Sequence, residues 1–452
     1  MKKHLGKTSL IDLGKEINWN RYVESLDKCR PMQLQGRIVK LSGIIAEANG
    51  PGLCIGSLCD IETTPGHFIR AEVVGFKDSK LILMPFGELR GVKPGSKVIE
   101  ITSRSTVPVG DAYIGRVIDG LGQPIDGKGE ITCDTEYPVY GEVINPLQRG
   151  IISEVMDVGI RAINSMITVG KGQRIAIMAG SGVGKSVLMG MMARNTAADV
   201  SIIALIGERG REVKEFVEKK LGEAGMKKSI VIASTSDTPA LIRIRAAYFA
   251  TALAEYFRDK GLDVLLVMDS VTRVAMSLRE VGLAAGEPPT SKGYTPSVFT
   301  QMPKLLERAG NLEKKGSITG IYNVLVEGDD MSEPVADTVR SIVDGHIVLS
   351  RAVSHKGHYP AIDVMASISR VMKDIVSSDH YNRSRKLIKT LAVYKDAEDL
   401  INIGAYQSGS DPEIDFAKKM IGRINTFLQQ QIDENSGFDE SVQRLNQLMA
   451  AG

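Results

Sequence analysis

Hydrophobic and polar positions alternate in short runs from about residue 29 to residue 100, and Gly, Pro, Asn and Asp separate the runs. Alternation buries one face of a strand and exposes the other, and closely spaced turns join such strands as antiparallel neighbours. The pattern therefore predicts a small antiparallel β-barrel over residues 29–100. The runs are GRIVKLSGII, GLCIGSLCDIE, FIRAEVVGF, KLILMPF and SKVIEI.

Continuous apolar runs replace this pattern after residue 100 and alternate with segments of helical period. That alternation is typical of a mainly parallel sheet whose strands are joined by crossover helices. It predicts an α/β domain over residues 101–375, and the helical period beyond it predicts a C-terminal helical domain over residues 376–452. The apolar runs are RIAIM, VSIIALIG, SIVIAST and DVLLVMD.

Residues 1–28 form a separate N-terminal segment. Trp19, Tyr22, Val23 and Leu26 fall on one face of a helix. This stripe spans about two turns, which is too short for a helix that is stable alone. We expect it to dock on the chain's own barrel, on a partner or on a membrane surface.

The composition is that of a soluble globular protein of several domains: 452 residues, of which 43% are hydrophobic and 24% are charged. A net charge of +2 gives no bulk attraction to nucleic acid or to an anionic membrane. No apolar run approaches the roughly 18 residues of a membrane helix. The opening MKKHLGKTSLIDLG lacks the apolar core and cleavage site of a signal peptide, so we expect a cytosolic protein.

The stretch AGSGVGKS, residues 179–186, has the composition of a phosphate-binding loop. The apolar run RIAIM precedes it and the helical run VLMGMMAR follows it, which is the context that such a loop requires. Gly180, Gly182 and Gly184 allow successive backbone N–H groups to point at phosphate oxygens, and the helix N-terminus adds partial positive charge. Ala179 stands where the usual pattern has glycine, and it is tolerated if its φ is negative.

Four side chains extend this site. Lys185 can reach the β- and γ-phosphates as a point charge, and the Ser186 hydroxyl can ligate Mg²⁺. Asp269 ends an apolar strand at the sheet edge where ligands bind, so we predict that it holds the Mg²⁺ through water. Glu208 ends a second strand and can polarise the attacking water. The predicted nucleotide-binding residues of the loop are Gly180, Ser181, Gly182, Val183, Gly184, Lys185, Ser186 and Val187.

Seven motifs occur in the order found in the catalytic subunits of the rotary ATP synthase superfamily. They are AGSGVGKS, GERGRE, LLVMDSVTR, GEPPTSKGYTPSVF, GSITGIYNVLVEGDD, DGHIVLSR and GHYPAIDVMASISR. From about residue 25 to residue 440 the chain resembles that superfamily, and in particular the flagellum-specific ATPases of the flagellar type III export apparatus. TSKGYTP and GHYPAIDV are closer to the export branch than to the synthase, and Ala179 is compatible with that branch. The resemblance implies a RecA-like core that hydrolyses ATP with Mg²⁺.

The resemblance also implies individual roles. Glu208 matches the catalytic glutamate and Arg209 its neighbouring phosphate-side arginine. Tyr359 matches the aromatic residue on which adenine stacks. Arg370 matches a finger that reaches into the neighbouring subunit's site, where it neutralises charge on the transferring phosphoryl group. Such a shared site implies a ring, and the family implies a homo-hexamer.

The partners implied by the resemblance belong to an export machine. The N-terminal segment, residues 1–28, would bind a regulatory, stator-like protein, and Lys2, Lys3 and Lys7 would contact acidic phospholipid. The ring would meet an export gate, a stalk-like protein and chaperone–substrate complexes. It would be cytoplasmic and peripherally associated with the inner membrane at the flagellar base.

Four alternatives remain at this point. The ATPase of a virulence injectisome shares the same chemistry, and the sequence separates it weakly. A catalytic subunit of a proton-translocating synthase shares the core. A hexameric RNA translocase also pairs a barrel with such a core, but Phe68, Phe76 and Phe86 are the only aromatic residues of the barrel segment, which is poor material for stacking bases, so we expect no nucleic-acid partner. A subunit that binds nucleotide without hydrolysing it is disfavoured by the presence together of Lys185, Glu208 and Asp269.

Overall fold

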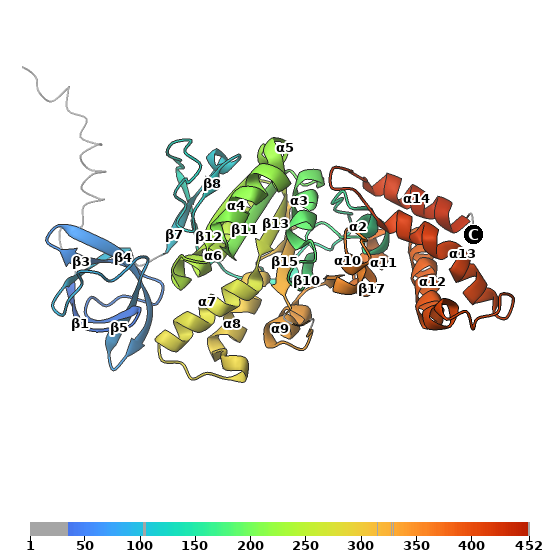
Figure 1. Ribbon diagram of the computed structural model, residues 1–452. Helices are drawn as coiled ribbons and strands as arrows, with labels where there is room; N and C mark the ends of the chain where they lie inside the picture. The colour runs from blue at the N-terminus through green and yellow to red at the C-terminus, as the bar shows by residue number, and fades with distance from the viewer. Residues whose placement is uncertain (1–34, 103–104, 314, 327, 329, 451–452) are drawn as a thin grey trace, which may run out of the picture.

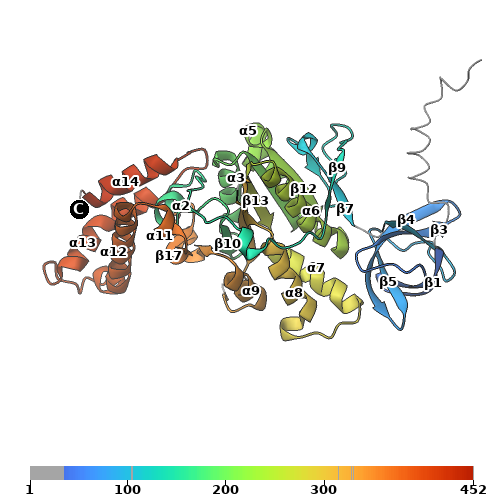
Figure 2. The ribbon, with the colours of Figure 1, turned by 180° about the vertical axis from the view of Figure 1, so that it is seen from behind.

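The computed structural model has three parts in a row along an elongated molecule: a barrel, a central sheet with helices on both faces, and C-terminal helices (Figures 1 and 2). This architecture confirms the fold class expected from the sequence. The N-terminal segment, residues 1–28, lies outside the described residues, and so does the helix expected there. The structure describes residues 35–102, 105–313, 315–326, 328 and 330–450.

Six antiparallel strands form the barrel, and they are β1 (Gln35–Ser42), β2 (Ile45–Asn49), β3 (Leu58–Thr64), β4 (His67–Lys77), β5 (Lys80–Pro85) and β6 (Lys97–Thr102). Their order is β1-β2-β5-β4-β3-β6, and β1 closes the barrel because it pairs with both β2 and β6. Alternate residues such as Ile38, Val73 and Leu83 fill the interior. The alternating runs of the sequence are thus the inward and outward faces of these strands.

The central sheet has the order β17-β16-β10-β15-β13-β11-β12-β8, with β14 beside β15. All neighbours pair in parallel except β17 with β16 and β14 with β15. A separate ribbon of β7 (Thr106–Val109) and β9 (Thr135–Pro138) lies beside it. The sheet strands are β8 (Val117–Ile118), β10 (Arg174–Ala179), β11 (Val200–Glu208), β12 (Ser229–Thr235), β13 (Asp263–Asp269), β14 (Gly310–Asn311), β15 (Ser317–Leu325), β16 (Gly345–Leu349) and β17 (Ile362–Ser369).

Helices bury both faces of this sheet, which explains why its strands read as continuous apolar runs. The helices are α2 (Arg161–Met166), α3 (Lys185–Asn195), α4 (Gly210–Glu215), α5 (Gly222–Met226), α6 (Ala240–Asp259), α7 (Val271–Ala284), α8 (Pro296–Leu306), α9 (Pro334–Ile342), α10 (Arg351–His355) and α11 (Met372–Ile375). On β11, Ile202 and Ala204 face the core that contains α6 and α7. Ile203 and Leu205 face the opposite core, which contains α3.

The C-terminal helices are α12 (Ser378–Asn402), α13 (Pro412–Leu428) and α14 (Phe438–Ala450). Leu387, Ile424 and Leu445, one from each helix, are buried in the same core as α3. These helices therefore pack onto the α3 side of the sheet. No helix within the described ranges is long and apolar enough to cross a bilayer.

Candidate functional site

The phosphate-binding loop has the geometry that its sequence predicts. It follows the buried strand β10 and leads into α3, whose first turn begins at Lys185. Gly182 and Gly184 have φ of 82° and 89°, a left-handed conformation that favours glycine. Ala179, by contrast, is the last residue of β10, is buried, and pairs with Leu325 and Leu349 on the two neighbouring strands. An alanine at this extended position is therefore free of strain.

Three charged side chains meet where neighbouring parallel strands end. The Lys185 Nζ lies 2.8 Å from Asp269 Oδ1 at the end of β13 and 3.6 Å from Glu208 Oε1 at the end of β11. The Asn323 amide on β15 donates a hydrogen bond of 2.5 Å to the same oxygen of Asp269. Parallel pairing sets Asn323 directly beside Asp269, so this contact follows from the register of β13 and β15. The strand ends thus assemble a lysine and two carboxylates at one sheet edge.

The environment of Glu208 raises the pKa of its carboxyl group toward neutral pH. Burial disfavours the charged carboxylate, and the negative charges of Asp269 and Glu212 act in the same direction, while Lys185 opposes them. Together they raise the pKa of Glu208 to about 7. A carboxyl group with this pKa can accept a proton at neutral pH, which is the property required of a general base.

A cavity of about 690 Å³ opens in front of the loop. Glu208 and Arg209 line it, and Arg209 is largely exposed and forms an ion pair of 3.2 Å with Glu212. Arg273 on α7 also lines it, although we did not single this residue out from the sequence. The Arg273 side chain packs over Gly207, directly before Glu208, and its buried Nε has no hydrogen-bond partner among the described residues. The cavity is therefore lined by several cations, as polyphosphate requires.

An apolar pocket of about 230 Å³ adjoins this cavity and shares Gly184 and Val187 with it. Tyr359 forms one wall and is 51% exposed. Its backbone carbonyl accepts a hydrogen bond of 3.0 Å from the N–H of Gln430, which follows α13. An exposed ring beside an apolar pocket can stack on a planar base whose phosphates lie in the loop.

Arg370 is exposed and directly follows β17. It lies beside the first residue of β10, at the end of that strand opposite to the loop. Its backbone N–H donates to the Asp344 carbonyl (2.9 Å), and the Asp344 N–H donates to the carbonyl of Arg174 (2.8 Å). Arg174 is the first residue of β10, whereas the loop follows the last. At about 3.3 Å per residue, β10 separates these points by roughly 17 Å. The fold brings Lys185, Glu208, Asp269 and Ser186 together but keeps Arg370 away from them.

The side chains around the loop suit an Mg²⁺ ion that is shared with water and substrate phosphates. They do not suit a metal ion whose ligands all come from the protein. Among the residues that the structure describes, no group of three or more His, Cys, Asp or Glu side chains could hold an ion. Mg²⁺ commonly takes one or two protein oxygens, with water and substrate phosphates completing its shell. The Ser186 hydroxyl and the Asp269 carboxylate are oxygen ligands of this kind.

Three segments of the chain match models of known families. Residues 159–369 match the nucleotide-binding domain of the ATP synthase alpha/beta family, and residues 38–101 match the β-barrel domain of that family. Residues 376–447 match the C-terminal domain of the type III secretion system ATPase EscN.

Relatives of known name cover nearly the whole chain. The flagellum-specific ATP synthase of Bacillus subtilis is 54% identical over 420 residues, which are 91% of this chain and 94% of the relative. The type 3 secretion system ATPase of Xanthomonas euvesicatoria is 48% identical over 411 residues, 91% of this chain and 93% of the relative. The assembled ATPase EscN of enteropathogenic E. coli has a TM-score of 0.87 at 44% identity, covering 92% of this chain and 100% of that chain. EscN is also known in complex with its central stalk EscO.

The fold and the cavity define a nucleotide-binding ATPase built from a barrel, a mainly parallel sheet and C-terminal helices. The chain belongs to the ATP synthase alpha/beta family, in the group that contains the flagellum-specific ATP synthases and the type III secretion system ATPases.

Proposed function

We propose that this chain is the ATPase of a flagellar protein export apparatus and that it acts as a homo-hexameric ring. The observation that carries the proposal is the 54% identity to the flagellum-specific ATP synthase of Bacillus subtilis over 91% of the chain. The second candidate is an injectisome ATPase, which the 48% identity to the Xanthomonas euvesicatoria protein supports. The two candidates share one chemistry and differ in the exported cargo.

A genetic test separates the two machines. We expect a chromosomal Lys185→Ala allele in the organism that encodes this chain to remove flagellar filaments, because the ring would no longer bind ATP tightly. The measurement is filament staining together with an assay of secreted effector proteins. Normal filaments with lost effector secretion would instead assign the chain to an injectisome.

We infer the following roles within one site. Lys185 and the N–H groups of the loop hold the β- and γ-phosphates of ATP. Ser186 directly and Asp269 through water would hold Mg²⁺, which would supply positive charge to neutralise the phosphates. Glu208 orients and polarises the attacking water, with Arg209 on the phosphate side. Tyr359 stacks on adenine.

The raised pKa of Glu208 gives a prediction about the pH dependence of hydrolysis. Protonated Glu208 cannot accept a proton from water, so kcat/KM should rise with pH through an apparent pKa near 7. Glu212 contributes to raising the pKa of Glu208, so Glu212→Gln should move this limb to lower pH. The measurement is steady-state hydrolysis between about pH 5.5 and 9 for both proteins. A wild-type profile that is flat across neutrality, or a limb that Glu212→Gln leaves in place, would contradict Glu208 as the base.

The assembly follows from the same chemistry. In a ring, Arg370 on one protomer would complete the site of its neighbour, since its own loop lies at the other sheet edge. The homologous EscN has been solved as an assembled ATPase and with a central stalk, which supports a ring and a stalk-like partner here. The ring would act at the cytoplasmic face of the inner membrane, beside the export gate, where it would receive chaperone–substrate complexes.

We assign the N-terminal segment, residues 1–28, to a regulatory, stator-like partner, with Lys2, Lys3 and Lys7 available for acidic lipid. Removal of residues 1–20 should leave the melting temperature and nucleotide binding unchanged but weaken regulator binding and ring assembly. The measurement is a pull-down of the regulator by full-length and truncated protein, with thermal melts of both. Equal pull-down rejects the partner role, and a melt many degrees lower for the truncated protein favours docking on the chain's own barrel.

A further inference from the structure

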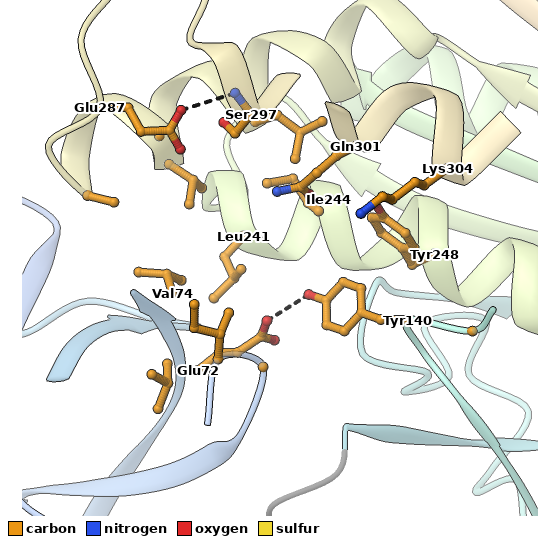
Figure 3. Close-up of a pocket in the computed structure, with 18 of the residues that line it drawn as sticks. Glu72, Val74, Tyr140, Leu241, Ile244, Tyr248, Glu287, Ser297, Gln301 and Lys304 are labelled. Carbon is orange, nitrogen blue, oxygen red and sulfur yellow. Dashed lines mark hydrogen bonds between the residues drawn. The ribbon is translucent and has the colours of Figure 1, made fainter. Parts of the chain in front are cut away.

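A second cavity, of about 490 Å³, lies where the barrel meets the sheet domain, apart from the nucleotide cavity. Strand β4 of the barrel forms one side, helices α6 and α7 form the floor, and α8 forms the other side (Figure 3). Val74 on β4, Leu241 on α6 and Val281 on α7 give it an apolar wall. Its volume is in the range of small-molecule sites.

Two buried ion pairs flank this cavity, and within each pair the two charges neutralise one another. Glu72 accepts hydrogen bonds from the Tyr140 hydroxyl (2.7 Å) and from Arg245 (3.3 Å). Arg308 bonds Glu255 through two of its nitrogens, at 2.8 and 2.6 Å. Because these charges are paired, Glu72 and Arg308 shape the cavity without demanding a ligand of their own.

The part of the cavity beside Gln301 and Lys304 differs, because the side-chain donors there are unpaired among the described residues. Lys304 and Gln301 project from α8 toward the cavity (Figure 3) and form no hydrogen bond or ion pair with any described residue. The hydroxyl of Tyr248, on a side chain only 6% exposed, also has no partner within the described ranges. Tyr248 lines the cavity, so its hydroxyl is free to donate a hydrogen bond to a ligand there. Burial raises the pKa of Tyr248 to about 12, so this hydroxyl keeps its proton and remains a donor.

The charges around this end favour an anion. The guanidinium of Arg308 lies 6.0 Å from the centre of the Tyr248 ring, but its charge is balanced by Glu255, so Lys304 is the unpaired cation among the described residues that line this end. Glu287 lies beside the N-terminal turn of α8, where it accepts the Ser297 N–H at 3.1 Å, whereas Lys304 lies near the C-terminal end of that helix (Figure 3). Ligand sites of this kind combine apolar walls with a few convergent polar groups.

We propose that this cavity binds a small amphipathic carboxylate. The ligand's carboxylate accepts hydrogen bonds from Lys304, Gln301 and Tyr248, and its apolar body lies against Val74, Leu241 and Val281. The site shares helix α7 with the nucleotide cavity, since Arg273 near the start of α7 lines that cavity and Val281 lines this one. The proposal does not depend on ATP hydrolysis.

The test uses octanoate and octylamine with the full-length protein in the absence of nucleotide. Binding is followed by saturation-transfer NMR and calorimetry. We expect saturable binding of octanoate at one site and no saturable binding of octylamine. Lys304→Gln should weaken octanoate about fivefold, the upper range for a partly exposed ion pair. Tyr248→Phe should weaken it about threefold through the lost hydrogen bond.

Lys419→Gln on α13 is the matched control, since it removes an exposed lysine far along the chain from this cavity and should leave octanoate binding unchanged. Thermal melts check that every variant is folded, which Lys304→Gln should be because its side chain is exposed. The proposal is overturned by the absence of saturable octanoate binding, by equal binding of octylamine, or by a Lys304→Gln protein that binds octanoate as tightly as wild type. Loss of ATP hydrolysis in other variants would leave these outcomes unaffected.

Discussion

Replacement of Glu208 by glutamine is expected to lower ATP turnover by about 10²- to 10⁴-fold, the range for removal of a general base. The amide has nearly the same shape as the carboxylate but cannot accept the proton of the attacking water. Glu208 Oε1 lies 3.6 Å from Lys185 Nζ, so the substitution removes a negative charge beside the lysine that we propose binds the phosphates. Binding of ATP should therefore be retained or become tighter.

The measurement pairs steady-state hydrolysis with equilibrium binding of a fluorescent ATP analogue. Glu212→Gln is the matched control, because Glu212 lines the same cavity and pairs with Arg209. At pH 8 this control should keep near wild-type turnover, since the ionised base remains present. If Glu208→Gln also turned over at nearly the wild-type rate, the assignment of the catalytic carboxylate would be wrong.

The strands that carry the site were predictable because both of their faces are buried. RIAIM became β10, and DVLLVMD became β13, ending at Asp269. Edge strands lack that signal. β17 is half exposed and pairs antiparallel with β16, so its sequence was recognised as a motif and not as a strand. The strand order of the sheet is likewise absent from the periodicity, since it depends on which helices cross over which strands.

The same distinction applies to single residues of the site. Lys185 and Asp269 were predictable because a loop motif and a strand end each position one of them. Asn323 was missed because it lies inside a buried run, and its bond to Asp269 depends on the register between β13 and β15. Arg273 is the last residue of LLVMDSVTR, four residues after Asp269 and in the first turn of α7, so attention to the helix after the strand would have found it.

The position of Arg370 required the structure and changes what the residue can do. The resemblance implied a finger, but only the antiparallel pairing of β17 shows that Arg370 and its own loop lie at opposite sheet edges. An arginine side chain is shorter than the roughly 17 Å that β10 spans between them. If Arg370 acts in hydrolysis, it must act in a second protomer.

Arg370→Ala should therefore lower turnover by about 10³- to 10⁵-fold, the effect of an arginine finger on phosphoryl transfer, without weakening ATP binding. Lys185→Ala should be equally inactive because it removes the charge that faces the phosphates. Mixing the two inactive proteins should restore part of the activity. In a randomly mixed ring, about one quarter of the interfaces combine an intact loop with an intact neighbouring arginine.

Activity is measured after mixing at several ratios and total concentrations, and wild-type specific activity should rise steeply with protein concentration as rings form. Arg385→Ala on α12, which removes another exposed arginine, is the control and should remain fully active. A mixture of Arg370→Ala with Arg385→Ala is a second control. In this mixture all activity requires the intact Arg370 of the Arg385→Ala protein, so it shows how much activity a mixed ring has when one of its two components is already active. Absence of rescue, together with a wild-type specific activity that does not depend on concentration, would rule out a site shared between protomers. Rescue that peaks at equal amounts of the Lys185→Ala and Arg370→Ala proteins is expected, because the number of complete interfaces is largest at that ratio.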